Sequence, residues 1–455
     1  MWTIGWQRRC DGLAPGSRPR RLPMGQPRSP CEFGETKMTR SGLAWLAMWG
    51  LLATSVQAAP QAVAKGRDVK IWAAAEAARP AQLELLKSVV NIDSGTGDVE
   101  GGRKVAQILI PRLKALGANV ESLPAEAPDL PENLVATLKG TGKARILLIG
   151  HIDSVFDPGT VGNWSFKQEG DRITGPGVGD EKGGVVQAIT ALQILKDQGF
   201  KDFGTLTLLI ETSEERGSPG TRALIDRLVK THDVELNLEP GDAPDLVTVW
   251  RKGSATIDID VKGRPAHAGV APQDGRNAAV ELIHQLAVVD ALPHTGQGLT
   301  ANLTILQAGS RYNIIPENAR AQINVRIREK ADLDRVETAF REAAKTTIIP
   351  DTKVTVTRET SFPPLPNNPM TDALAARAQA IYAGIGLSLG TGGNGGASES
   401  ALSHEAGTPA LDGLGPVGGN FHTDKEWVDL NSVTPRLYLL TKLIMDLSAK
   451  PPKTN

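Results

Sequence analysis

The stretch from Thr207 to Gly220 constrains the fold and function of this chain more than any other. The apolar run Leu208 to Ile210 is typical of a buried strand, and it leads into the adjacent carboxylates of Glu214 and Glu215. On its own, a glutamate pair after a strand is most often a solvated turn, because charged side chains usually stay at the surface. The alternative is a site at the end of a buried strand. The rest of the chain decides between these two interpretations.

Predicted helices and strands alternate on both sides of this stretch. The patterns predict helices over 69–90 (interrupted near Pro80), 103–116 (kinked at Pro111) and 185–195, and strands over 133–140, 144–150 and 234–238. This alternation favours an α/β fold with a mostly parallel sheet that helices cover on both faces. In such sheets, ligands bind beyond the carboxyl ends of the strands.

The first 58 residues do not fit a globular domain. Residues 1–37 are rich in Arg, Pro and Gly, and residues 38–58 combine a short basic start, an apolar run and a small-residue end. This second pattern is that of a secretory signal peptide, so we expect the chain to start at Met38 and the mature protein to be periplasmic or secreted. An uncleaved N-terminal anchor is the alternative.

Removing this leader changes the charge and the cysteine content. Subtracting its 8 basic and 3 acidic residues from the totals of 50 and 51 leaves 42 basic and 48 acidic residues, a net charge of −6. A mildly acidic protein without a basic patch argues against nucleic acid as a partner. Both cysteines, Cys10 and Cys31, also leave, so the mature chain can form no disulfide. After signal removal we expect no membrane association.

Several apolar runs end in residues that can bind a metal. Besides Glu214 and Glu215, the candidates are His151, Asp180 and Glu239, and His422 near the C-terminus. Imidazole and carboxylate groups of this kind suit Zn²⁺. Taken singly, each has an ordinary explanation: a loop histidine, a helix cap at Asp180, or a turn at Glu239-Pro240.

The spacing of these candidates favours a joint site. Asp180 lies 29 residues after His151, Glu215 lies 35 residues after Asp180, and Glu239 follows 24 residues later. The segments HID, GPGVGDEKGG, ETSEE, LEPGD and FHTDKEWVD together resemble the M20 metallopeptidase family over nearly all of the mature chain. Within that family the chain is most similar to the glutamate carboxypeptidase branch.

The resemblance implies a two-zinc site, although cobalt or manganese could use similar ligands. It assigns His151 to one zinc, His422 to the other, Asp180 as the bridge, and one ligand each to Glu215 and Glu239. The three carboxylates and a bridging hydroxide would balance the charge of two Zn²⁺ ions. Glu214 would remain unligated as the general base for the metal-bound hydroxide.

Two further features are implied around these ligands. Asp153 would accept the second ring N–H of His151 and fix its tautomer. The family also places a cis peptide bond after the bridging aspartate, here between Asp180 and Glu181.

After Trp250 the pattern changes from α/β alternation to strand, helix, strand, strand, helix, strand. This order predicts an inserted ferredoxin-like α+β domain over 252–363. The catalytic domain would then comprise 59–251 and 364–450. In the family, the insertion forms a lid and the interface of a homodimer.

The resemblance also suggests residues that meet the substrate. His267 would approach the oxyanion, usually from the partner subunit, and Asn313, Arg326 and Ser398 would contact the substrate. A guanidinium suits a substrate carboxylate because it binds bidentately. However, Thr360 stands where relatives that cleave glutamate are expected to carry a second cation, which weakens a preference for glutamate.

We therefore expect an exported di-zinc carboxypeptidase that releases a C-terminal residue, with glutamate favoured, from a small peptide or an N-acyl amino acid. An N-acyl-amino-acid amidohydrolase or dipeptidase with the same machinery is the first alternative. A non-catalytic binding protein on the same fold is the second, and the intact Glu214 with all five ligands argues against it.

Overall fold

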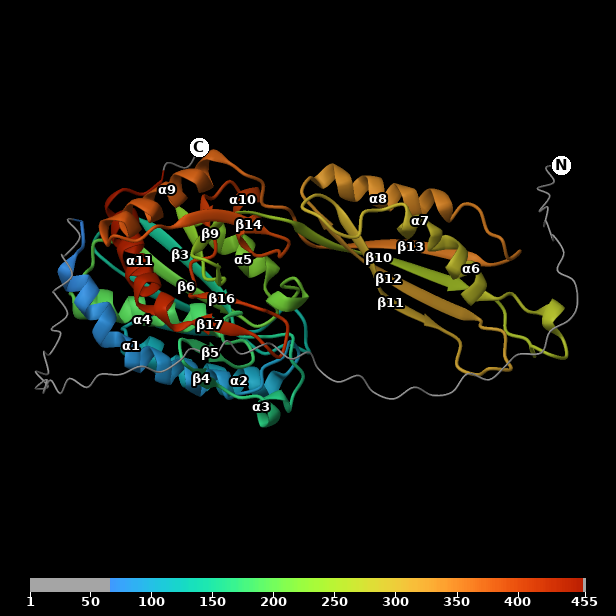
Figure 1. Ribbon diagram of the computed structural model, residues 1–455, viewed down its shortest axis with the longest axis horizontal. Coiled ribbons are helices and arrows are strands. Elements are labelled where there is room, and N and C mark those ends of the chain that lie inside the picture. Colours follow the sequence, from blue (N-terminus) through green and yellow to red (C-terminus); the bar gives the residue numbers. More distant parts are fainter. Residues whose placement is uncertain (1–65, 453–455) are drawn as a thin grey trace, which may run out of the picture. The chain divides into compact units, whose positions relative to one another are not determined.

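The computed structural model describes residues 66–452, so the predicted leader and signal peptide lie outside the described residues. A six-stranded sheet lies between helices in the larger part of the chain (Figure 1). Its strands, in spatial order, are β1 (Asn119–Leu123), β2 (Asn133–Lys139), β6 (Thr205–Glu211), β3 (Arg145–His151), β7 (Val234–Asn237) and β15 (Ala410–Leu411). The last four run parallel and the first two pair antiparallel. The expected mostly parallel α/β sheet is therefore confirmed.

Helices cover both faces of this sheet because its central strands are apolar on both sides. In β3, Ile146 and Leu148 pack with one set of helices, and Leu147 and Ile149 pack on the opposite face. The first set is α1 (Val69–Val90), α2 (Val99–Ala115), α4 (Lys182–Asp197), α9 (Pro369–Gly384) and α11 (Leu430–Ala449). The opposite face packs against α5 (Arg222–Val229) and α10 (Ser400–Glu405).

The first two helices differ from the sequence prediction. α1 runs without interruption through Pro80, so the predicted break is wrong. A proline removes one intrahelical hydrogen bond, but burial of the apolar face of α1 outweighs that loss. α2 begins at Val99 rather than at 103, because the Asp98 side chain caps it by accepting from the Gly101 N–H at 2.9 Å.

A second, mixed sheet of seven short strands was not predicted. Its order is β14 (Gly390–Asn394), β9 (Leu246–Arg251), β8 (Gly241–Asp242), β16 (Val417–Gly419), β17 (Trp427–Asp429), β5 (Arg172–Thr174) and β4 (Lys167–Glu169). Strands of two or three residues are too short to show an alternating pattern in sequence. This sheet matters for the site because the β16–β17 hairpin carries His422.

Residues 253–362 form a separate antiparallel sheet (Figure 1). Its order is β11 (Thr300–Ala308), β12 (Asn318–Ile327), β10 (Gly253–Lys262) and β13 (Lys353–Phe362). Helices α6 (Ala278–Gln285), α7 (Ala287–Asp290) and α8 (Lys330–Ala343) pack on one face through a core of its own. The order of strands and helices is the predicted one. Short helical turns at α3 (Thr160–Asn163), η1 (Glu214–Arg216) and η2 (Pro272–Asp274) complete the described elements.

No helix within residues 66–452 combines the length and the apolar character needed to cross a membrane.

Candidate metal centre and active site

The parallel register of the central strands brings the predicted site residues to one edge of the sheet. β3 and β6 end side by side, since His151 pairs with Glu211, and β7 pairs with β3 on its other side. The turn that follows β6 contains Glu214 and Glu215, and the segment that follows β7 contains Glu239. Residues that are distant in sequence therefore meet beyond the carboxyl ends of three strands.

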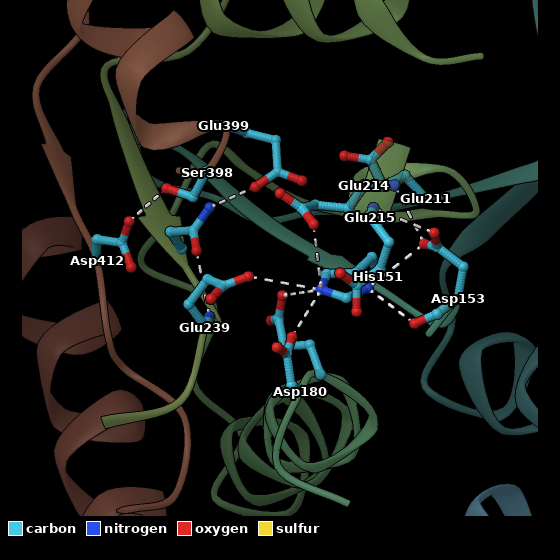
Figure 2. Close-up of polar contacts among 12 residues, drawn as sticks. His151, Asp153, Asp180, Glu211, Glu214, Glu215, Glu239, Ser398, Glu399 and Asp412 are labelled. Carbon is cyan, nitrogen blue, oxygen red and sulfur yellow. Dashed lines mark hydrogen bonds and ion pairs between the residues drawn. The ribbon is translucent and has the colours of Figure 1, made fainter. Parts of the chain in front are cut away.

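His151, Asp180 and Glu239 form the first potential metal-binding group (Figure 2). His151 Nε2 lies 3.2 Å from Asp180 Oδ1 and 3.5 Å from Glu239 Oε1, and all three side chains are buried. Among the described residues, Nε2 has no hydrogen-bond partner. A buried ring nitrogen that faces carboxylate oxygens without a hydrogen bond fits a bound cation at this position.

Asp180, Glu215 and His422 form the second potential metal-binding group. His422 Nε2 lies 3.2 Å from Asp180 Oδ2 and 3.1 Å from Glu215 Oε2. The backbone of His422 has φ 62°, a left-handed conformation that is uncommon for a residue other than glycine. Asp180 thus presents one oxygen to each histidine, as the predicted bridging residue would.

The charges in this cluster require positive compensation. The carboxylates of Asp180 and Glu215 accept hydrogen bonds from the His422 imidazole and raise its pKa to about 10. Burial alone would raise the pKa of Asp180, but His151 and His422 together hold it below its ordinary value. Burial, followed by the charge of Asp180, raises the pKa of both Glu215 and Glu239 to about 7. Histidine and carboxylate donors in two such groups fit two divalent cations.

Asp153 holds the site together differently from the prediction. The nearest partner of His151 Nδ1 is the backbone carbonyl of Asp153 at 3.0 Å, while the Asp153 carboxylate lies 3.4 Å away. The carboxylate instead accepts the backbone N–H groups of Glu214 and Glu215 at 3.1 and 3.2 Å, and the Thr96 hydroxyl at 2.7 Å. The Asp153 side chain therefore positions the glutamate pair, and its main chain orients the histidine.

The peptide bond between Asp180 and Glu181 is cis, as predicted. A residue that the sequence reasoning missed, Glu426, supports this segment from the β16–β17 hairpin. Its buried carboxylate accepts the backbone N–H groups of Gly179 at 2.8 Å and Asp180 at 3.0 Å. The segment FHTDKEWVD contained this glutamate, but nothing in its spacing indicated which backbone it would hold.

A buried arginine, Arg251, was also missed. Its Nη2 lies 3.2 Å from Glu239 Oε2, and the same guanidinium binds both oxygens of Asp412 at 2.7 Å. Arg251 and Asp412 are 3% and 0% exposed, so this is a fully desolvated ion pair behind a predicted metal ligand. The sequence feature that could have indicated Arg251 is its position at the end of the apolar strand Leu246–Arg251.

Ser398 does not occupy the predicted substrate position. Its hydroxyl is buried and donates to Asp412 at 2.5 Å, and its side chain points away from the predicted metal ligands (Figure 2). The preceding Gly395 and Gly396 line the pocket instead. The glycine-rich segment therefore contributes backbone rather than a hydroxyl to the pocket.

Replacing Arg251 with methionine is expected to destabilise the protein by about 3–5 kcal/mol, because removing one partner of a buried pair leaves the other charge uncompensated. Urea denaturation of the zinc-free protein measures this change. The matched control is Arg377→Met, whose ion pair with Asp446 is partly exposed at 2.6 Å. That variant is expected to lose less than about 1 kcal/mol. Equal losses in both variants would contradict a special role for Arg251.

A pocket of about 690 Å³ opens beside the two groups. Asp180, Glu214, Glu215, Glu239 and His422 line it from one side, and Ser254, Thr256, Asn324 and Arg326 line it from the antiparallel sheet. Arg326, which the sequence predicts to contact the substrate, is therefore part of the pocket wall. The pocket lining includes neither Asn313 nor His267, and both are exposed. His267 Nδ1 accepts the backbone N–H groups of Gly269 and Val270 at 3.1 Å.

Comparison with known proteins defines the class. The family model for Peptidase family M20/M25/M40 matches residues 147–446, so the chain belongs to this family and is a metallopeptidase. Carboxypeptidase G2 from Pseudomonas sp. (strain RS-16) is 36% identical over 411 residues, covering 89% of this chain and 98% of that protein. Succinyl-diaminopimelate desuccinylase from Sphingopyxis alaskensis is 30% identical over 269 residues, covering 54% of this chain and 68% of that protein.

Solved structures share the fold at lower identity. The di-peptidase Dug1p from Saccharomyces cerevisiae matches with a TM-score of 0.67 at 14% identity, covering 85% of this chain and 100% of that chain. Aminopeptidase PepT from Bacillus cereus matches with a TM-score of 0.65 at 21% identity, covering 82% of this chain and 99% of that chain. At this identity the likeness shows the M20 fold alone.

Proposed function

We propose that this protein is an exported di-zinc carboxypeptidase that hydrolyses the amide bond to a C-terminal residue, with glutamate favoured. The observation that carries the proposal is Asp180, whose two oxygens face His151 and His422 in two separate donor groups. These groups adjoin one pocket that also contains Glu214 and Arg326. The similarity to carboxypeptidase G2 over nearly the whole chain supports the same activity.

The zinc ions would be held by His151, Asp180 and Glu239 on one side and by Asp180, Glu215 and His422 on the other. When bound, they supply Lewis acidity and lower the pKa of water. The nitrogen and oxygen donors of both groups suit zinc. Arg251 keeps Glu239 in place, and Glu426 keeps the backbone of Asp180 in place.

Glu214 is the proposed general base. It belongs to neither donor group, and its Oε2 lies 4.0 Å from His151 Nε2. Asp153 fixes its backbone N–H, so the side chain is positioned without being bound to a metal. Burial raises the pKa of Glu214 well above its ordinary value, which suits a group that takes a proton from water and returns it to the leaving amine. Arg326 would bind the free carboxylate of the substrate.

Export follows only from the sequence of residues 1–58, and it is tested by the size and compartment of the expressed protein. Activity is tested by incubating the zinc-loaded mature chain with pteroyl-glutamate, N-acetyl-glutamate and a neutral dipeptide. Preferred hydrolysis of pteroyl-glutamate supports the proposal. Preferred hydrolysis of N-acetyl-glutamate or of the dipeptide would indicate an amidohydrolase or dipeptidase. No turnover with two zincs bound would indicate a binding protein.

We also propose a homodimer formed through the antiparallel sheet. β11 is an edge strand, and Leu303, Ile305 and Leu306 on it are 39%, 40% and 53% exposed. On helix α6, which packs against β10 and β12 of the same sheet, Ile283 is 65% exposed. An exposed apolar edge strand of this kind is suited to pairing with another chain. The exposed His267 would then serve the active site of the partner.

Mixing two inactive variants tests this shared site. His267→Ala and Glu214→Ala homodimers are each expected to lose most turnover while keeping two zincs per chain. After random subunit exchange between equal amounts of the two variants, about half of the dimers are mixed, and each mixed dimer contains one intact site out of two. Activity should therefore return to about one quarter of the wild-type value. Sedimentation verifies that mixed dimers form. Full activity of the His267→Ala homodimer, or mixed dimers without recovery, would contradict the proposed role of His267.

A further inference from the structure

Two buried polar residues, Asn237 and Glu399, lie next to one another behind the predicted metal ligand Glu239. Asn237 is the last residue of β7, and Glu399 immediately precedes α10, which packs on β7. Both residues are 0% exposed, and Asn237 pairs with Ile149, which belongs to the apolar core between the sheet, α5 and α10. Polar groups in such a core cost free energy unless they are hydrogen-bonded, so each of them should have a defined partner.

The Asn237 amide forms a hydrogen bond at each end. Its Oδ1 accepts the backbone N–H of Glu239 at 3.2 Å, and its Nδ2 donates to Glu399 Oε2 at 2.9 Å. Glu239 lies beyond the last residue of β7, so its N–H needs an acceptor outside the ladder of the sheet. Because Oδ1 faces an N–H group, Nδ2 has to face an acceptor, and a carboxylate oxygen is a strong one.

The Glu399 side chain is fixed by this contact. Its other oxygen, Oε1, has no hydrogen-bond partner within residues 66–452. The buried guanidinium of Arg251 binds both oxygens of Asp412 and one oxygen of Glu239 instead. The Glu399 carboxylate therefore acts on the site through Asn237.

Glu239 is in turn held at two points. Asn237 binds its backbone N–H, and Arg251 Nη2 lies 3.2 Å from its Oε2. These contacts leave Oε1 facing the metal-binding group, 3.5 Å from His151 Nε2. Hydrogen bonds that fix both the main chain and one oxygen of a carboxylate determine where its second oxygen points.

We propose that Glu399 is a positioning residue for the first metal-binding group, because it orients Asn237 and Asn237 orients the main chain of Glu239. This inference rests on the zinc binding that the proposed function includes. Residues that orient a metal ligand in this way typically contribute about tenfold to hundredfold to metal affinity. The second group contains neither Asn237 nor Glu239, so its zinc affinity should not depend on Glu399.

The experiment measures zinc affinity by competition with a chelating dye. In mature protein that carries His422→Ala, only the first group is complete, and Glu399→Leu should lower its zinc affinity by about tenfold to hundredfold. Glu399→Gln should keep the affinity near that of the parent, because its amide oxygen accepts the same hydrogen bond. In the His151→Ala protein, where only the second group is complete, Glu399→Leu should change the affinity by less than about threefold.

Exchanging the two polar groups separates positioning from packing, because side-chain volume stays the same. Asn237→Asp removes the donor and places two carboxylates opposite each other, so zinc affinity of the first group should fall by about tenfold. Adding Glu399→Gln restores a donor and an acceptor in the reverse order, so the double variant should recover most of the lost affinity. This exchange keeps the inference testable if Glu399→Leu does not fold.

Glu281 provides a control for a buried carboxylate that is remote from the metal-binding groups. It is 0% exposed and accepts the backbone N–H groups of Ile348 and Ile349 at 2.8 Å, next to the antiparallel sheet. Glu281→Leu should lower the melting temperature of the zinc-free protein and leave its zinc affinity unchanged.

The outcomes distinguish this inference from the proposed function. Equal losses of zinc affinity in the His422→Ala and His151→Ala proteins would overturn the inference and leave the proposed function standing. A double variant that binds zinc no better than Asn237→Asp would do the same. The expected loss and recovery, in a protein that hydrolyses none of the proposed substrates, would support the inference and overturn the proposed function. A wild type that binds no zinc would overturn both.

Discussion

Replacing Glu214 with alanine is expected to lower kcat by about 10³-fold or more while the protein keeps two zincs per chain. The reason is that Glu214 lies outside both donor groups, so its loss removes proton transfer and leaves the metal ligands in place. Zinc content by elemental analysis and kcat with the preferred substrate are the two measurements. The isosteric Glu214→Gln should behave in the same way, because an amide cannot take up the proton.

The adjacent glutamate provides the matched control. Glu215 lies 3.1 Å from His422 within the second donor group, so Glu215→Ala should lose zinc as well as activity. The two substitutions are at adjacent positions in the chain. The expected difference between the two variants is the amount of zinc that each binds. A Glu214→Ala protein that loses zinc would exchange the roles assigned to the two residues.

Replacing Asp180 with alanine is expected to have the largest effect on metal content, because this side chain faces both histidines. Zinc should fall from two per chain to less than one, and turnover should fall to background. His422→Ala, which removes a donor from only one group, should retain one zinc. If Asp180→Ala retained one zinc with full affinity, its carboxylate could not be the bridge.

Thermal unfolding gives a second readout for Asp180. A metal that binds only the folded state stabilises it in proportion to the logarithm of metal concentration over Kd. Added zinc should therefore raise the melting temperature of the wild type strongly, that of His422→Ala less, and that of Asp180→Ala least. A general loss of packing would lower the melting temperature of a variant without zinc as much as with zinc. Comparison with the zinc-free proteins therefore separates such a loss from a loss of zinc binding.

The fold was predictable where the signal is local and repeated. Apolar runs such as Ile146 to Ile149 indicated buried parallel strands, and the alternation in Gly253–Lys262 indicated a strand with one buried face. The helix through Pro80 was not predictable, because packing against the core decides whether a helix tolerates a proline. Strands such as β8 and β15 have two residues each and follow only from their neighbours.

In the site, sequence alone indicated the candidate residues near the strand ends, of which His151 is the first and His422 the last. Their side-chain chemistry and their spacing can both be read directly from the sequence. The glutamate pair that could have been a solvated turn lies in this site, with Glu215 in a donor group and Glu214 outside it. Tertiary structure alone decided the partners of these residues: the Arg251–Asp412 pair behind Glu239, and Glu426 against the backbone of Asp180. Such contacts join segments more than 150 residues apart, and no local pattern specifies which buried charge will meet which.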